Sequence, residues 1–240
     1  MGRVGVSWTC APEFTMQVMR LPNIVIRGIY THFSRADEAD KSHTHLQISR
    51  FREVLGKLEK EGVEIPLRHC ANSGAILDVE ESYFDMVRPG LMIYGYYPSM
   101  TVSHSIPLVP ALSLHSRINN IKIVEAGTPL SYGGKYVTSK ETRIASVTIG
   151  YGDGFTRQLT GKAEALIAGR RYPVVGVICM DQILVDIGMH TSVKLGDRVT
   201  LIGSDTGESI TAWTLAESIG TIPYEIFCQI SPRVPRIYTE

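Results

Sequence analysis

The sequence predicts an α/β region followed by a mostly antiparallel β domain, and three observations lead to this fold class. Helical and extended patterns alternate as far as about Ser105, which is typical of parallel strands joined by crossover helices. After that point the chain becomes a series of short β-forming runs, separated by turns that contain glycine or asparagine, as in antiparallel sheets. The segment 99–110 lies between the two patterns. We therefore expect two domains, residues 1–104 and residues 105–240.

The first domain is expected to contain two helices and two strands before residue 72. Cap-forming residues and a proline suited to a first turn predict a helix over residues 9–20. Residues 24–31 are rich in β-branched side chains and predict a strand. Apolar residues at helical spacing predict a second helix over residues 42–61, ended by Gly62. The apolar run 67–71 predicts the next strand.

Two neighbouring strand ends in this domain have the pattern of an anion site. The apolar runs 67–71 and 84–87 are followed by Asn72-Ser73-Gly74 and by Arg88-Pro89-Gly90, as where buried parallel strands lead into ligand-binding loops. A short helix beginning near Ser73 would present backbone N–H groups. In a (β/α)8 barrel the phosphate site commonly follows the last two strands. Two ordinary strand-to-helix turns explain the same stretch equally well.

The second domain is expected to be a mostly antiparallel sheet with late helices. A turn is predicted at Asn119-Asn120, and a helix over residues 211–219, ended by Gly220, with a second short helix from Pro223. The predicted strands are 111–118, 121–125, 143–148, 163–167, 172–177, 182–187 and 198–202.

Composition narrows the function classes. The chain has 240 residues, 44% of them hydrophobic, and carries 24 basic and 24 acidic residues, as expected of a globular protein whose main partner is neither nucleic acid nor an anionic membrane. It contains no apolar run long enough to span a bilayer, and its start lacks a signal-peptide core. The four cysteines lack CxxC spacing, which favours reduced thiols and a cytoplasmic location.

The segment RADEADKSHTH, residues 35–45, contains residue types that bind metals. Its acids precede a predicted helix with Ser42 as a capping residue, so capping and the helix dipole explain the pattern. We therefore expect no metal site.

A set of motifs spread along the whole chain resembles the alanine racemases, which are pyridoxal 5'-phosphate enzymes. Each string alone is weak evidence, but their common order makes the resemblance specific. It implies a partial (β/α)8 barrel followed by a mostly antiparallel β domain, and interconversion of L-alanine and D-alanine, with D-alanine supplied for peptidoglycan. The motifs are Met1-Gly2-Arg3, Gly28-Ile29-Tyr30-Thr31-His32-Phe33, Asn72-Ser73, Arg88-Pro89-Gly90-Leu91, Ser131-Tyr132-Gly133, Gly150-Tyr151-Gly152-Asp153-Gly154, Cys179-Met180-Asp181-Gln182 and Pro223-Tyr224-Glu225.

The resemblance also reveals a missing part. In the family, the lysine that holds the cofactor covalently lies in an AVVKANAYGHG-like stretch on the first barrel strand, before the Met-Gly-Arg motif. This chain begins inside that motif, and none of its lysines has such a context. The resemblance therefore implies the C-terminal portion of a racemase, inactive by itself.

The resemblance assigns catalytic roles to three residues. Racemisation requires a proton to leave one face of the α-carbon and another to arrive on the opposite face. Tyr132 matches the base for the L-enantiomer, and the missing lysine is the other base. A free tyrosine, with a pKa of about 10, is a poor base at neutral pH, and His32 and Arg88 match the residues that assist it. Arg88 also matches the arginine that faces the pyridine nitrogen, where a permanent cation disfavours ring protonation.

The remaining matched positions bind cofactor or substrate. Met180, through its backbone N–H, and Asp181 match positions that bind the substrate carboxylate, and Tyr151 matches a tyrosine at the entrance. In the family these three and Tyr132 come from the partner subunit, which implies a homodimer with shared sites. The substrate-binding positions are Arg3, Tyr151, Met180 and Asp181. The cofactor-binding positions are Arg3, Asn72, Ser73, Arg88, Gly90, Leu91 and Tyr224, with the phosphate on Ser73, Gly90, Leu91 and Tyr224.

Three alternatives remain open at this point. A racemase for serine differs by one hydroxyl on the substrate, which the motifs do not distinguish. A related barrel-type amino-acid decarboxylase that uses the same cofactor fits less well at Ser131-Tyr132-Gly133 and Cys179-Met180-Asp181-Gln182. A non-catalytic remnant or interaction module is favoured by the absence of the cofactor lysine.

Overall fold

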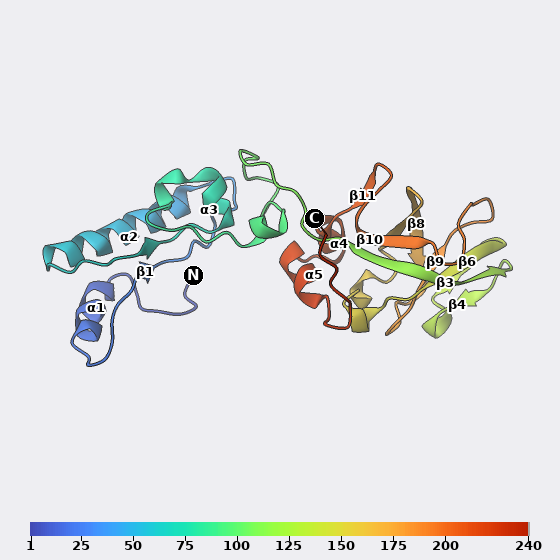
Figure 1. Ribbon diagram of the computed structural model, residues 1–240, viewed down its shortest axis with the longest axis horizontal. Helices are drawn as coiled ribbons and strands as arrows, with labels where there is room; N and C mark the ends of the chain where they lie inside the picture. Colours follow the sequence, from blue (N-terminus) through green and yellow to red (C-terminus); the bar gives the residue numbers. More distant parts are fainter. Residues whose placement is uncertain (240) are drawn as a thin grey trace. The chain divides into compact units, whose positions relative to one another are not determined.

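A computed structural model describes residues 1–239, and the chain divides into two compact units, one from Met1 to Ala111 and the other from Leu112 onward. Unit 1 contains helices and short parallel strands, and unit 2 contains the large antiparallel sheet (Figure 1). The predicted fold class, a partial barrel followed by a β domain, is confirmed.

Unit 1 follows the predicted β/α alternation. Strand β1 pairs in parallel with β2, Ile29 with Arg68 and Tyr30 with His69, and a parallel bridge joins His69 to Met86. Three successive segments therefore lie side by side in the same direction, as βαβ connections require. The elements are α1 (Ala11–Met19), β1 (Ile29–Tyr30), α2 (Ser42–Lys60), β2 (Arg68–His69), α3 (Ser73–Asp78) and the 3-10 turns Glu80–Ser82 and Leu91–Tyr94.

Helix α2 provides much of the core of unit 1. Its buried residues Ile48, Phe51, Val54 and Leu58 recur at helical spacing, so one face of the helix is apolar. The helix begins at Ser42, where the sequence predicts it. The accepting side chain at its start is Asp40, which receives the backbone N–H of Ser42 at 2.9 Å and its hydroxyl at 2.6 Å. The expectation that Ser42 itself caps the helix is therefore wrong.

The strands of unit 1 are shorter than predicted. Of the predicted strand 24–31, only Ile29 and Tyr30 pair, and Val25 is 77% exposed. The run 84–87 contributes a single bridge. Extended residues become a strand only where a neighbour accepts and donates backbone hydrogen bonds. Among residues 1–239, β1 has such a neighbour on one side alone.

Unit 2 is built on a seven-stranded sheet in the order β11-β10-β3-β6-β9-β8-β7, with every pair antiparallel. Strand β7 also pairs with β10, so the sheet curls back on itself. A small hairpin, β4 with β5, lies outside the large sheet. The strands are β3 (Leu114–Val124), β4 (Pro129–Leu130), β5 (Tyr136–Val137), β6 (Thr142–Val147), β7 (Glu164–Ile167), β8 (Arg170–Val175), β9 (Ile183–Asp186), β10 (Arg198–Asp205) and β11 (Glu208–Ile210).

Strand β3 corrects one prediction. Asn119-Asn120 is not a turn but part of one continuous strand, and the register with β6 shifts between Ile118 and Asn120. Such a bulge bends a strand and increases its twist. The first part of β3 pairs with β10 and the part after the bulge pairs with β6. The bend lets one strand pass from one neighbour to the other.

Two late helices agree with the sequence. Helix α4 (Ala212–Ile219) is capped by Thr211, whose hydroxyl accepts the backbone N–H of Thr214, and it ends at Gly220 with a φ of 72°. Helix α5 (Pro223–Gln229) begins with proline and packs against α4 (Figure 1). Within residues 1–239, no helix combines the length and the apolar character needed to cross a bilayer.

Candidate active site

Arg88 is the centre of a polar cluster at the strand ends of unit 1. Its guanidinium lies 2.5 Å from Nδ1 of His69 and 3.2 Å from Nδ1 of His32, and it donates to the carbonyls of Thr31 at 2.8 Å and Cys70 at 3.1 Å. These four acceptors lie on or beside neighbouring strands, so the parallel pairing positions the arginine. All four are neutral groups when the histidines are neutral, which leaves the positive charge of Arg88 uncompensated by them.

The two histidines have a defined protonation state. Because a guanidinium can only donate, both Nδ1 atoms must accept, and each neutral ring then carries its proton on Nε2. Burial first, and then the charge of Arg88, lowers the pKa of both His32 and His69; the charge of Arg3 also lowers that of His32. His32 therefore presents an N–H donor on the side away from Arg88.

An aromatic ring completes the setting of Arg88. The ring of Tyr30 stacks on His69, with centroids 5.2 Å apart and an angle of 8° between planes, and Cζ of Arg88 lies 5.3 Å from the Tyr30 centroid. This cation–π contact favours the charged guanidinium in a half-buried place.

Ser73 and Gly90, which follow the two neighbouring strand ends, are joined directly. The backbone N–H of Gly90 donates to Oγ of Ser73 at 2.9 Å, and Ser73 is buried. Since this oxygen accepts one hydrogen bond, its own proton remains available to an anion. A Cβ at position 90 would lie 3.8 Å from the same hydroxyl, an ordinary van der Waals distance. Leu91, the next residue, is buried and begins a 3-10 turn.

Helix α3, which carries Ser73, is held to the loop that follows β1. Oδ1 of Asn72 caps the helix by accepting from Ala75 N at 3.2 Å, and Nδ2 of the same side chain donates to Phe33 O at 3.4 Å. A Cβ at Gly74 would lie 2.8 Å from the carbonyl of Ala36. The helix can approach this loop so closely only because position 74 has no side chain.

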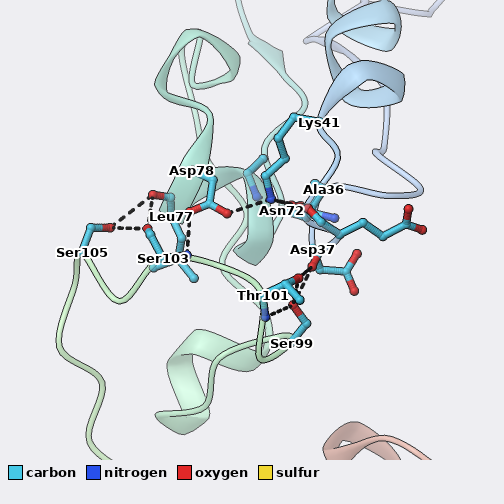
Figure 2. A network of polar contacts seen from close by, with 12 residues as sticks. Ala36, Asp37, Lys41, Asn72, Leu77, Asp78, Ser99, Thr101, Ser103 and Ser105 are labelled. Atoms are coloured by element: carbon cyan, nitrogen blue, oxygen red, sulfur yellow. Dashed lines mark hydrogen bonds and ion pairs between the residues drawn. The ribbon is translucent and has the colours of Figure 1, made fainter.

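A polar network, shown in Figure 2, ties the far end of α3 to the same loop. Nζ of Lys41 donates to Ala36 O at 2.8 Å and Glu38 O at 2.7 Å, and lies 2.7 Å from Oδ2 of Asp78. The loop carbonyl of Asp37 also accepts from two further hydroxyls, those of Ser99 and Thr101. Burial raises the pKa of Asp78, but hydrogen bonds from Lys41 and Ser103 lower it more, so that the net shift is downward.

In unit 2, two loops meet at one segment, residues 176–181. The backbone N–H of Tyr151 donates to Cys179 O at 3.0 Å, and that of Gly152 donates to Met180 O at 2.8 Å. From the β4–β5 hairpin, Oγ of Ser131 donates to Val177 O at 2.6 Å. The structure therefore gathers the loops that carry Tyr132, Tyr151, Met180 and Asp181.

The side chains on these loops face solvent in this chain. Tyr132 is 71% exposed, Met180 55% and Tyr151 43%, and Asp181 is also exposed. Tyr224 lies in the first turn of α5 and is 40% exposed. Arg3 is exposed near the start of unit 1.

Sequence reasoning missed the neighbours that hold the predicted residues. His69 and Tyr30 fix Arg88, and the pair Lys41–Asp78 fixes the loop beside α3. A histidine inside the apolar run 67–71 was one available signal, since a polar side chain in a buried strand requires a partner. No comparable signal exists for Lys41 and Asp78, which are far apart in sequence and become neighbours only in the fold.

Comparisons with known proteins identify the family of this chain. A family model described as "Alanine racemase, C-terminal domain" matches residues 111–238, and one described as "Alanine racemase, N-terminal domain" matches residues 1–98. An alanine racemase from Carboxydothermus hydrogenoformans is 46% identical over 239 residues, which cover 99% of this chain and 65% of that protein.

Two solved structures show the same fold. The alanine racemase of Bacillus anthracis with bound L-Ala-P superposes with a TM-score of 0.93 at 41% identity, covering 100% of this chain and 62% of that one. The alanine racemase of Bartonella henselae with covalently bound pyridoxal phosphate gives 0.87 at 29% identity, covering 100% and 64%. This chain thus spans less than two thirds of the length of these relatives. Because both family models match, and because the Carboxydothermus relative is similar along nearly the whole of this chain, the chain belongs to the alanine racemase family.

Proposed function

We propose that this chain forms the cofactor-anchoring part and one of the two proton-transferring parts of a pyridoxal phosphate-dependent alanine racemase. The observation that carries the proposal is the position of Arg88, a cation surrounded by neutral acceptors beside the Ser73–Gly90 pair. A phosphate would bind at that pair, and a nitrogen-containing ring would face the guanidinium. The enzyme would act in the cytoplasm as a homodimer.

The residues of unit 1 fit pyridoxal 5'-phosphate. The hydroxyl of Ser73 and the backbone of Gly90 and Leu91 would hold the phosphate, because the fold brings Ser73 and Gly90 within hydrogen-bond distance of each other. Arg88 would keep the ring nitrogen unprotonated, since a permanent cation opposes a second positive charge. When bound, the cofactor supplies an acceptor for the electron pair that remains when the α-proton leaves.

Tyr132 and His32 would move and stabilise the proton on one face of the substrate. Tyr132 would take the α-proton of L-alanine at its phenolic oxygen. His32, neutral and protonated on Nε2, could donate a hydrogen bond that stabilises a phenolate. Tyr132 and His32 belong to different units of the chain, and the resemblance implies that they meet across a dimer.

The loops of unit 2 would also bind the substrate. The backbone at Met180 and the side chain of Asp181 would orient the carboxylate, with Arg3 as a cationic partner and Tyr151 at the entrance. Their exposure in a single chain is what a site completed by a second copy requires. Tyr224 would contribute to the phosphate site.

Activity would require a second base that this chain lacks. By resemblance, that base is the cofactor lysine of a preceding segment, and none of the chain's lysines has its sequence context. The chain alone should therefore bind the cofactor phosphate and yet racemise nothing. Joined to a lysine-bearing segment, it should interconvert the two enantiomers of alanine.

The experiment compares the chain alone with the same chain preceded by the lysine-bearing segment of the Carboxydothermus relative. Pyridoxal phosphate binding is followed by fluorescence quenching, and racemisation by a coupled D-alanine assay, with L-serine and decarboxylation assayed in parallel. Ser73→Ala should weaken phosphate binding in both forms, and Ser139→Ala, at an exposed serine, should not. A folded, cofactor-loaded extended chain that leaves alanine unchanged, or decarboxylates amino acids instead, would refute the proposal.

A further inference from the structure

Ser131, the residue before Tyr132, has an unusual backbone conformation. Its φ is 62° and its ψ −174°, a combination that residues with a side chain rarely adopt and that costs free energy. It lies in the loop between β4 and β5, directly after Leu130. Such strain persists only where the surrounding structure enforces it, and it is concentrated at functional sites.

The segment opposite Ser131 enforces this conformation in two ways. Val177 O accepts the Ser131 hydroxyl at 2.6 Å, and Cys179 Sγ lies 3.7 Å from Oγ of Ser131. Gly176, with a φ of 68°, approaches so closely that a Cβ there would lie 2.6 Å from Cβ of Ser131 and 3.3 Å from Leu130 O. Val177 therefore provides the hydrogen-bond acceptor, and Gly176 provides the space that the Ser131 side chain occupies.

The segment that holds Ser131 also leads to the predicted substrate loop. Cys179 immediately precedes Met180, Val177 lies two residues before Cys179, and Cys179 O accepts from Tyr151 N at 3.0 Å. A Cβ at Gly150 would lie only 2.2 Å from that carbonyl, so the two loops are in backbone contact. Ser131 thus joins the loop of Tyr132 to the two loops beside which the substrate would lie.

We propose that Ser131 is a positioning residue for Tyr132. Its hydroxyl bond to Val177 O holds the strained backbone, and this fixes the direction in which the exposed phenol of Tyr132 leaves the hairpin relative to Met180. Serine suits this place because glycine would adopt the φ freely but could not donate the bond, and alanine would keep the strain without the bond. The inference rests on the proposed function, from which the role of Tyr132 as a base is taken.

The first test uses the chain as it is and needs no cofactor. In Ser131→Ala, amide hydrogen exchange at Gly134, whose N–H donates to Ser131 O at 3.1 Å, should rise about tenfold, and Ser139→Ala should leave it unchanged. Gly176→Ala should lower the midpoint of urea unfolding. The same substitution should lower the urea midpoint less in a Ser131→Gly background, because residue 131 then has no Cβ to contact the new Cβ at position 176. Unchanged exchange, or an equal effect of Gly176→Ala in both backgrounds, would overturn the proposal.

The second test uses the extended, lysine-bearing enzyme in deuterium oxide. Each enantiomer is supplied separately, and deuterium incorporation at the α-carbon is measured at early times in the unconverted substrate, L-alanine or D-alanine. Ser131→Ala should slow incorporation into L-alanine by about tenfold or more, because a small displacement of a base is costly, and should change incorporation into D-alanine much less.

The outcomes of this test separate the two proposals. An equal loss for both enantiomers would mean a general structural defect and would overturn the role of Ser131. Incorporation into neither enantiomer in the unsubstituted, cofactor-loaded enzyme would refute the proposed function and, with it, the role of Tyr132. The coupling between Ser131 and Gly176 would then still decide whether the hairpin is held as described.

Discussion

The ion pair between Lys41 and Asp78 allows a quantitative prediction about unit 1. The side chains are only 18% and 11% exposed, and Nζ of Lys41 also donates to two loop carbonyls. Lys41→Met would remove the donor to Asp78 Oδ2 and to both carbonyls, and the carboxylate would keep its bond from the Ser103 N–H. Removing one partner of a buried pair costs about 3–5 kcal/mol. With partial exposure, we expect a loss of about 3 kcal/mol in the free energy of unfolding of unit 1.

The chain contains a convenient reporter for this measurement. Its two tryptophans, Trp8 and Trp213, lie in different units. In a Trp213→Phe chain, tryptophan fluorescence therefore comes from unit 1 alone. Urea unfolding is then compared for the Lys41→Met, Asp78→Asn and doubly substituted chains. Asp78→Asn should cost less than Lys41→Met, because Lys41 keeps its bonds to the two loop carbonyls and the single amide oxygen can still accept from the Ser103 N–H that donates to Oδ1. The double-mutant cycle should give a coupling well above experimental error.

The sign of the pH dependence follows from the pKa of Asp78, which lies below its ordinary value. A depressed carboxyl pKa stabilises the folded state above the unfolded-state pKa, about 3.9. That contribution is lost as the pH falls through the lower, folded-state value. The difference between the unsubstituted chain and Lys41→Met should therefore shrink in strong acid.

An exposed ion pair in the same loop provides the control for Lys41→Met. Arg35 forms a surface pair with Glu38, with side chains 55% and 46% exposed, and Arg35→Met should have no measurable effect. If Lys41→Met proved as harmless as Arg35→Met at neutral pH, the contacts of Lys41 would not hold the loop. The account of how α3 is positioned would then be wrong.

Two further substitutions test the geometry of each unit. Arg88→Met should raise the pKa of His32 and His69, seen by NMR titration, yet leave both below 6.5 because burial remains; an unchanged pKa would contradict the contacts. Since lowered histidine pKa values favour the neutral folded form, stability should fall as pH drops through the ordinary value. Gly150→Ala should destabilise unit 2 by about 1–3 kcal/mol in thermal unfolding, since its Cβ would overlap backbone. Gly56→Ala, in open space on α2, is the control and should not destabilise.

Local sequence signals predicted the elements whose ends are fixed by their own residues. The helix after Thr211 begins with a hydroxyl cap and ends at a glycine with positive φ, both of which are visible in the sequence. Asn119-Asn120 shows the limit of such signals. The same two residues suit a turn or a bulge, and the choice depends on the two different strands that β3 must reach.

The site shows the same division between local and non-local information. The strand-end pattern predicted that Ser73 and Gly90 would come together, because the ends of parallel strands meet at one edge of a sheet, and they are hydrogen-bonded. The sequence did not predict that His69 would hold Arg88, nor that Ser131 would be strained. Both features depend on which residue of a distant segment lies opposite, and that is decided by packing of the whole unit.

The short parallel ladder of unit 1 has a consequence for how the chain unfolds. Between β1 and β2 only two residue pairs are in register, whereas unit 2 has a sheet that curls until β7 meets β10. Unit 1 therefore depends to a large extent on side chains that donate to carbonyl oxygens. One of them, Lys41, is paired with the Asp78 carboxylate, which acid neutralises. Unit 2 depends mainly on a continuous backbone ladder that protonation leaves intact. Two cooperative blocks with different chemical sensitivities thus follow one another along a single polypeptide.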